Sequence, residues 1–293
     1  MSSSALSVPR RVTAPTAAPA RTRKPRGNAL AHVVLILGSV TMVFPFVWEI
    51  ILSLSTQAQA TSVPPVFWPG TLHFDNFAKV FEQLPFLNQF GVSIAITVIR
   101  VGAQVVLCSM AGYAFARMRF RFRGVLFAAV LVILMVPPQV FLLTQYQIVQ
   151  SLGLLNSIGG IVLPGLFNAF GAFLMRQFFL GLPDELEEAA RLDGANPFQV
   201  FWRVMLPLAA PGISALVVIG VLVSWNDLLW PLVVSTYASG APLSVGLATL
   251  QGQYTVQYPV LMAASLLASG PIIVLFLVLQ RRVIDGLAYS GLK

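Results

Sequence analysis

The sequence predicts an all-α polytopic membrane protein with six transmembrane helices. Of its 293 residues, 57% are hydrophobic and only 10% are charged, whereas a soluble domain carries about 25% charged residues. Long apolar segments recur along the chain, and each is long enough to cross a hydrocarbon core about 30 Å thick. We therefore expect transmembrane helices at about residues 30–54, 90–115, 124–144, 158–180, 206–234 and 259–280.

The N-terminal segment differs in composition from the rest of the chain. Residues 1–28 are rich in Ser, Ala, Pro, Thr and Arg and show no apolar periodicity, which is typical of a disordered tail. Ala58-Gln59-Ala60 imitates a signal-peptide cleavage site. However, the apolar segment before it has about 25 residues, whereas a signal peptide has an apolar region of about 7–15. We expect a disordered tail at 1–28, followed by one transmembrane domain over 29–293.

Proline and glycine interrupt two of the expected spans. Such residues kink or break a helix, and irregular backbone inside a membrane must be covered by protein or line a cavity. We expect breaks in the third and fourth spans at Pro137, Pro138, Gly159, Gly160, Pro164 and Gly165.

Positive charges lie on one side of the expected spans. The opposite side has Lys79 alone, so the positive-inside rule predicts that both termini are cytoplasmic. Membrane-proximal arginines also explain the basic tail, and we expect no nucleic-acid partner. The cytoplasmic cations are Arg10, Arg11, Arg21, Arg23, Lys24, Arg26, Arg117, Arg119, Arg121, Arg123, Arg191, Arg203, Arg281, Arg282 and Lys293.

Several kinds of catalytic site are excluded by the residues present. Cys108 is the single cysteine, so there is no disulfide framework. His32 and His73 are isolated and lack metal-ligand spacing. None of the lysines follows a glycine, which excludes a nucleotide-binding Walker A loop. We expect no catalytic residue, metal site or bound cofactor in this chain.

The segment 181–205 is acidic although it lies between two apolar spans. Pro183 precedes four acids, which favour a helix N-terminus, and Gly194 is suited to end that helix. Asn196-Pro197 then predicts a second short helix. An amphipathic connector resting on lipid is the simpler interpretation, but an anionic inner leaflet attracts basic helices. We therefore interpret 184–205 as a docking segment for a cytoplasmic partner.

This segment resembles a known motif. Glu188-Ala189-Ala190, then Gly194, Val204 and Leu206-Pro207, match the pattern EAA-x3-G-x9-I-x-LP of ABC importer permeases, with valine in place of isoleucine. The segments GYAFARMRFRFRG, FLMRQFF, SWNDLLWPLVV and LMAASLLAS resemble the carbohydrate branch of that family. Within this branch the chain is similar to the six-span permease subunit of maltose-type systems.

The resemblance implies a bacterial plasma-membrane subunit that translocates a sugar, either a disaccharide or an oligosaccharide, by alternating access. It implies as partners a second permease subunit, two ATP-binding subunits that hold ATP and Mg, and an extracellular solute-binding protein, besides membrane lipid. The ATPase-coupling residues that it implies are Glu188, Ala189, Ala190, Asp193, Gly194 and Pro207. The residues of an outer loop that it places near the binding protein are Gln251, Gln253 and Tyr254.

Polar and aromatic residues inside the spans are candidates for the substrate pathway, although an interfacial aromatic belt is an alternative. The candidates are Trp225, Asn226, Asp227, Trp230, Gln139 and Asn168. Arg100 and Asp227 lie about 14 Å and about 10 Å below the outer ends of their spans, at 1.5 Å per residue. We hypothesise that they pair. Alternatively, Arg100 binds backbone carbonyls of a broken helix while Asp227 lines a wet cavity.

Three other functions remain open at this point. An importer of glycerol 3-phosphate or a glycerophosphodiester has related motifs. An ion-driven secondary transporter predicts internal repeats and membrane carboxylates. A membrane scaffold without transport activity requires the EAA match to be a coincidence.

Overall fold

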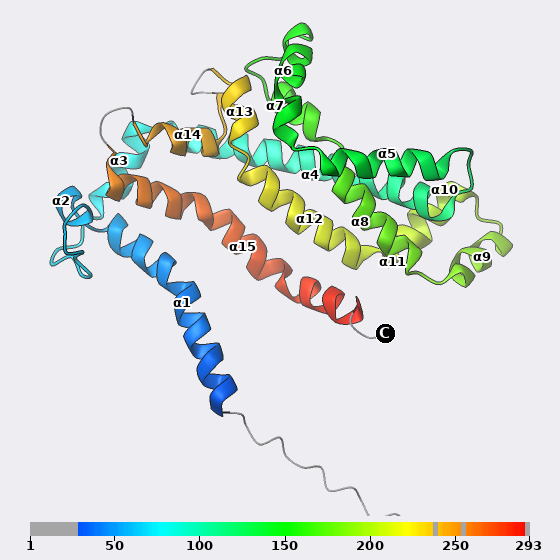
Figure 1. Ribbon diagram of the computed structural model, residues 1–293, viewed down its shortest axis with the longest axis horizontal. Helices are drawn as coiled ribbons and strands as arrows, with labels where there is room; N and C mark the ends of the chain where they lie inside the picture. Colours follow the sequence, from blue (N-terminus) through cyan, green and yellow to red (C-terminus); the bar gives the residue numbers. More distant parts are fainter. Residues whose placement is uncertain (1–28, 237–239, 253–255, 291–293) are drawn as a thin grey trace, which may run out of the picture. The chain divides into compact units, whose positions relative to one another are not determined.

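The computed structural model describes residues 29–236, 240–252 and 256–290, so the predicted tail lies outside the described residues. The regular structure of the described residues is entirely helical (Figure 1). The chain divides into two units, Met1–Pro45 and Phe46–Lys293, and each is considered by itself. The described part of the first unit belongs to α1, Ala29–Ser53, which contains Pro45 and matches the first expected span.

Helix α4, Phe86–Arg117, is the central element of the second unit. It packs most extensively against α8, Ala169–Leu180, and α12, Ala210–Trp225. Glycines permit these close approaches: a Cβ at Gly112 would lie 2.7 Å from that of Met175 in α8, and one at Gly220 in α12 would lie 3.0 Å from Gln104 Oε1. Small residues at crossing points are typical of membrane helix packing.

Helix α15, Tyr258–Ser290, packs against α12 and against α3, Asp75–Gln83. Ala264 and Ala268 are buried in this contact, in a core that also contains Val80 of α3. The indole nitrogen of Trp225 donates a hydrogen bond to the carbonyl of Ala268 at 3.1 Å. The small residues of the last span therefore serve helix packing.

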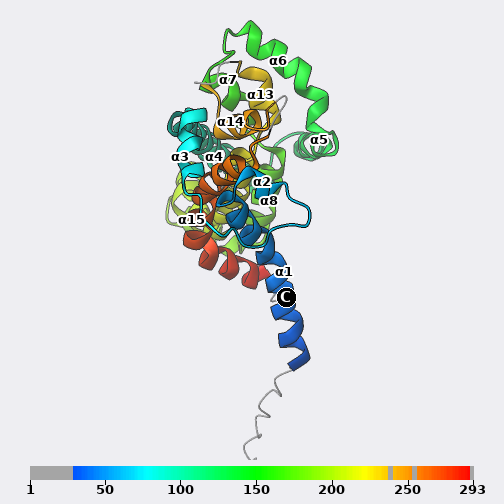
Figure 2. The same ribbon diagram turned by 90° about the vertical axis from the view of Figure 1, so that its left-hand side faces the viewer.

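The breaks expected in the third and fourth spans are present. Helix α5, Arg123–Met135, is followed by η1, Pro138–Phe141, and α6, Leu142–Ser151, at an angle of 98°. Figure 2 shows α6 extending away from α5. The other break has an angle of 45° and separates α8 from the pair α7, Ile158–Val162, and η2, Leu163–Gly165.

The region expected to hold the fifth span is divided into several pieces. The segment Pro197–Leu208 comprises α10 (Pro197–Gln199), the π-helical segment η3 (Val200–Met205) and α11 (Leu206–Leu208), and it meets α12 at 74°. Helix α12 ends at Trp225, before α13, Leu229–Val234, and α14, Leu243–Thr249. The expectation of one continuous helix over 206–234 is therefore wrong, because α11, α12 and α13 divide this region.

Membrane crossing is consistent with these lengths. Among the described residues, three single helices and three bent pairs are long and apolar enough to be spans. Six crossings result if each bent pair is one span. The count of six therefore stays a prediction, whereas the all-helical membrane architecture is confirmed.

Candidate functional site

A cavity of about 610 Å³ lies where the broken helices meet α4 and α12. Its aromatic lining is provided by Phe167, Phe170 and Trp230. Its polar lining consists mainly of carboxamides, together with one hydroxyl and two opposite charges. These polar residues are Arg100, Gln104, Gln139, Gln145, Asn168, Ser224, Asn226 and Asp227.

Arg100 and Asp227 form an ion pair in the wall of this cavity. Arg100 Nη1 lies 2.7 Å from Asp227 Oδ2, and the two side chains are 9% and 22% exposed. The pairing predicted from depth is confirmed. Arg100 Nη2 also donates to the carbonyl of Ile161 at 3.3 Å, so the alternative bond to a broken helix is present as well.

Gly165 makes room for this arginine. A Cβ at Gly165 would lie 2.4 Å from Arg100 Nε, which is closer than non-bonded atoms approach. Gln104, one helical turn after Arg100, donates its amide to the carbonyl of Gly165 at 2.8 Å. The break between η2 and α8 is thus fixed to α4 by two side chains.

Asp227 can reach Arg100 because α12 ends at Trp225, two residues before Asp227. The Asn226 amide donates to the carbonyl of Leu222 at 2.8 Å, and the Ser244 hydroxyl donates to the backbone carbonyl of Asp227 at 2.7 Å. Trp230 Nε1 is shared between the carbonyls of Gly160 and Ile161, each at 3.2 Å. These bonds satisfy polar backbone that an apolar environment would otherwise leave unpaired.

Most of the expected pathway residues come together here. Gln139, Asn168, Asn226, Asp227 and Trp230 all line the cavity. The side chain of Asn168 also caps α8 by accepting a hydrogen bond from the amide of Gly171 at 3.1 Å.

Trp225 lies elsewhere. It is not among the lining residues, and its ring packs edge-on against Phe90, with the ring centres 5.8 Å apart. The sequence reasoning missed Gln104 and Gln145. Gln104 follows Arg100 by four residues in one helix and therefore shares its face, so this signal was available.

The acidic segment forms the two short helices that were expected. Helix α9, Asp184–Leu192, begins after Pro183 and carries acids in its first turn. Gly194 has a φ of +84°, the left-handed conformation that glycine adopts without strain. Asn196 then caps α10 through a reciprocal pair of hydrogen bonds with Gln199. The turn chemistry that was read from the sequence is confirmed.

The residues expected to couple to an ATPase are mostly exposed. Glu188, Ala189, Asp193, Gly194 and Pro207 are accessible, whereas Ala190 is half-buried and packs against the core around Phe201. A hollow of about 380 Å³ lies beside the turn. It is lined by Ala190, Asp193, Gly194, Ala195, Gln199, Arg203 and Val204.

Glu187 has a role that the sequence did not indicate. Its residue exposure is only 6%. Its carboxylate accepts a hydrogen bond from the hydroxyl of Tyr113 in α4 at 2.9 Å and another from Arg191 at 2.6 Å. The pair Glu187–Arg191 has the spacing of helical neighbours, but Tyr113 is 74 residues away and no local pattern reveals it.

Arg117 provides a second attachment of the same region to α4. Its guanidinium donates to the carbonyl of Phe179 from Nε at 3.0 Å and from Nη2 at 2.6 Å. It also contacts the carbonyl of Leu182 and the carboxylate of Asp184. The start of α9 is therefore fixed to the end of α4 by charge-assisted bonds, which are stronger than neutral ones.

The expected outer loop is described only in part. Gln251 is exposed in the turn after α14. Gln253 and Tyr254 lie outside the described residues. Across 29–236, 240–252 and 256–290, no group of three or more His, Cys, Asp or Glu residues is placed to hold a metal ion.

The sequence of the chain is similar to those of known transport permeases. An arabinooligosaccharides transport system permease protein from Halalkalibacterium halodurans is 37% identical over 254 residues, which cover 86% of this chain and 91% of that protein. An sn-glycerol-3-phosphate transport system permease protein from Salmonella typhi is 32% identical over 89% of this chain and 95% of its own length.

A solved structure is also similar. A bacterial ABC transporter involved in the import of the acidic polysaccharide alginate contains a chain with a TM-score of 0.74 and 26% identity, covering 86% of this chain and 94% of that chain. Residues 104–288, more than half of the chain, match one family model. The chain therefore belongs to the family described as the binding-protein-dependent transport system inner membrane component.

Proposed function

We propose that this chain is the permease subunit of an ABC importer for a neutral disaccharide or oligosaccharide. Its family membership makes it a membrane component of a binding-protein-dependent importer. The relative from Halalkalibacterium halodurans is named as an arabinooligosaccharides transport permease, which supports a sugar as the substrate of this chain. Membership of this family disfavours an ion-driven secondary transporter and a scaffold without transport activity.

The proposal of a neutral substrate rests on the balance of charges in the cavity lining. Among the described residues that line it, Arg100 is the one cation, and Asp227 neutralises it at 2.7 Å. The other polar groups are mainly carboxamides, which both donate and accept hydrogen bonds to neutral hydroxyls. Aromatic rings beside them offer apolar faces to a sugar ring. A phosphate monoester is bound most strongly by cations that lack an ion partner, and Arg100 already has one, so the cavity favours a sugar over glycerol 3-phosphate.

The substrate proposal is tested with the assembled transporter in proteoliposomes. We expect uptake of a labelled neutral oligosaccharide to be reduced by unlabelled neutral oligosaccharides, but not by glycerol 3-phosphate or by an acidic uronate oligosaccharide. The uronate is included because the structural relative imports an acidic polysaccharide. Uptake of glycerol 3-phosphate or uronate in preference to the neutral sugar would overturn the proposal.

A variant that removes the negative charge of Asp227 tests the charge argument directly. Asp227→Asn leaves the Arg100 charge without its ion partner, so we expect neutral-sugar uptake to fall while binding of an acidic competitor rises. Gln145→Asn is the matched control, because it retains a carboxamide in the lining and changes no charge. Equal effects of the two variants would contradict the charge argument.

We infer a heteromeric assembly in the bacterial plasma membrane. It comprises a second permease subunit, two ATP-binding subunits that hold ATP and Mg, and an extracellular solute-binding protein. This chain is non-catalytic. Both termini and α9 face the cytoplasm, which the asymmetry of arginine and lysine supports. The turn that contains Gln251 faces outward, towards the binding protein.

The attachment of α9 to α4 suggests how a movement driven by ATP hydrolysis is transmitted to the cavity. Tyr113 and Arg117 bind α9 and its preceding turn, and Arg100 lies in the same uninterrupted helix. Thirteen residues separate Arg100 from Tyr113, which corresponds to about 20 Å of helix. We infer that α4 transmits displacement of α9 to the Arg100–Asp227 pair and thereby opens or closes the cavity.

A further inference from the structure

The segment between α2 (Gln57–Ala60) and α3 exposes large apolar side chains next to the end of α1. Residues 62–72, hereafter the aromatic loop, have the sequence SVPPVFWPGTL. Val63, Phe67 and Trp68 are 95%, 65% and 71% exposed. The described stretch from Ile50 to Phe74 contains no Asp, Glu, Lys or Arg.

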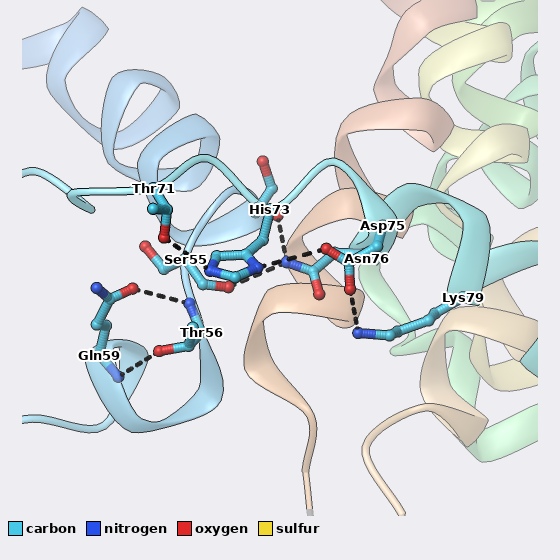
Figure 3. A network of polar contacts seen from close by, with 9 residues as sticks. Ser55, Thr56, Gln59, Thr71, His73, Asp75, Asn76 and Lys79 are labelled. Carbon is cyan, nitrogen blue, oxygen red and sulfur yellow. Dashed lines mark hydrogen bonds and ion pairs between the residues drawn. The ribbon is translucent and has the colours of Figure 1, made fainter.

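Both ends of the aromatic loop are fixed to the last residues of α1 and the turn after it (Figure 3). At its beginning, Thr56 and Gln59 bind each other's backbone amides in a capping box. At its end, the His73 amide donates to the carbonyl of Leu54 at 2.9 Å. The buried Asn76 side chain donates to the carbonyls of Ser53 and Ser55 at 2.9 Å and 3.0 Å. The loop is therefore a positioned element of the fold.

The tip of the loop returns along α1. The rings of Phe67 and Trp48 lie 5.4 Å apart. Trp48 precedes the last helical residue, Ser53, by five positions, which corresponds to about 7.5 Å along the helix. The loop thus lies beside the final turns of a candidate membrane span, where Phe46 and Ile50 are also exposed.

We propose that the aromatic loop inserts into the boundary between the headgroups and acyl chains of the membrane and anchors the outer end of α1. Phe67 and Trp68 have no charged residue beside them in the loop sequence, and such aromatic residues suit this boundary. Pro64, Pro65 and Pro69 have no N–H group, so insertion leaves fewer donors to desolvate. The exposed apolar side chains lie beside the exposed apolar residues Phe46 and Ile50 of the span. The loop itself has no charged residue that could pair with a protein, which favours lipid as its occupant.

The residues that follow define the water-facing limit of the anchor. Lys79 donates a hydrogen bond to Asp75 at 2.5 Å, and this bond lowers the pKa of the Asp75 carboxyl. Asp75 therefore stays ionised at neutral pH, and an ionised carboxylate favours water. The aromatic loop is on the lipid side of this boundary and α3 is on the water side.

The test uses the full chain, assembled with its transport partners in lipid nanodiscs. Trp68→Cys carries an environment-sensitive fluorophore, and Glu82→Cys on the exposed surface of α3 is the matched control. The native chain gives the labelling background, because Cys108 is fully buried. Emission is measured with lipids that carry brominated acyl chains and, separately, with iodide in the buffer.

We expect the label at position 68 to emit at shorter wavelength and to lose intensity with brominated lipid but not with iodide. The label at position 82 should show the reverse. Quenching at position 68 by iodide alone would overturn the proposal. Protection that arises only after the solute-binding protein is added would also overturn it and would assign the loop to that protein. Neither outcome depends on which substrate is carried.

Discussion

The cavity and the region of α9 are both attached to α4, but by contacts of different kinds. At the cavity, an ion pair joins Arg100 to Asp227 in a helix break, and the other described residues of the lining are uncharged. At α9, buried Glu187 and charge-assisted bonds of Arg117 fix a helix whose outer surface is exposed. The first arrangement turns polar groups inwards to a cavity, whereas the second leaves a surface exposed.

In the proposed function, α4 links the cavity to the region of α9, because each of them has its own anchor on this uninterrupted helix. Arg100 binds Asp227 and Ile161 in the broken segments, and Tyr113 binds Glu187 in α9. A change at one anchor should therefore affect both sites, whereas a change on the exposed surface of α9 should leave the cavity intact. Three substitutions separate these cases, in order of decreasing expected effect.

The largest effect is expected from removal of one member of the ion pair. Arg100→Met leaves Asp227 unpaired, and breaking a buried pair from one side costs about 3–5 kcal/mol. Because Asp227 is 22% exposed, we expect the lower part of that range. The double variant Arg100→Met with Asp227→Asn should recover part of the loss of stability. Thermal unfolding of the purified complex measures this, and strictly additive losses would show that the pair is not coupled.

A smaller effect is expected at the anchor of α9. Tyr113→Phe removes one hydrogen bond to an ionised group, which is worth about 1.5–3 kcal/mol. We expect more ATP hydrolysed per sugar transported, because α9 then moves without α4. Glu185→Gln, on the exposed side of α9, is the control and should leave this ratio unchanged. An unchanged ratio in Tyr113→Phe would remove Tyr113 from the transmission path.

The smallest effect on stability is expected at the turn after α9. Gly194→Val places a β-branched residue at a φ of +84°, which costs about 1–3 kcal/mol of local strain. No atom beyond the glycine's neighbours would contact its Cβ, so membrane insertion should be normal while coupling is lost. Gly181→Ala is the matched control, since Gly181 has a φ of −80°. Transport equal to that of the native chain would remove the turn from the coupling surface.

Features encoded by local chemistry could be predicted from the sequence. Gly194 and Asn196 fixed the turn between the short helices, and the prolines at 138 and 164 located two breaks. The Arg100–Asp227 pair followed from depth, because charges in one layer of a membrane gain by pairing.

Features created by tertiary contacts could not be predicted in this way. The end of α12 at Trp225 lacks a glycine or proline, and its cause is the set of bonds that hold Asp227 and Asn226. The burial of Glu187 depends on Tyr113 in another helix. Helix α12 is apolar on all sides, so its sequence does not indicate which side faces the cavity. Trp225 was expected in the substrate pathway, but it faces α15 and bonds to Ala268.

In the proposed function, a neutral sugar passes through the cavity beside Arg100 and Asp227. The most direct measurement is the rate of thiol labelling of Asn226→Cys in the cavity lining, compared with Leu232→Cys, which is exposed but outside the lining. The transporter is supplied with ATP and with binding protein carrying a neutral oligosaccharide. We predict that the sugar slows labelling at position 226 and leaves position 232 unchanged, and that glycerol 3-phosphate slows neither. Labelling at position 226 that is indifferent to the sugar would contradict the account.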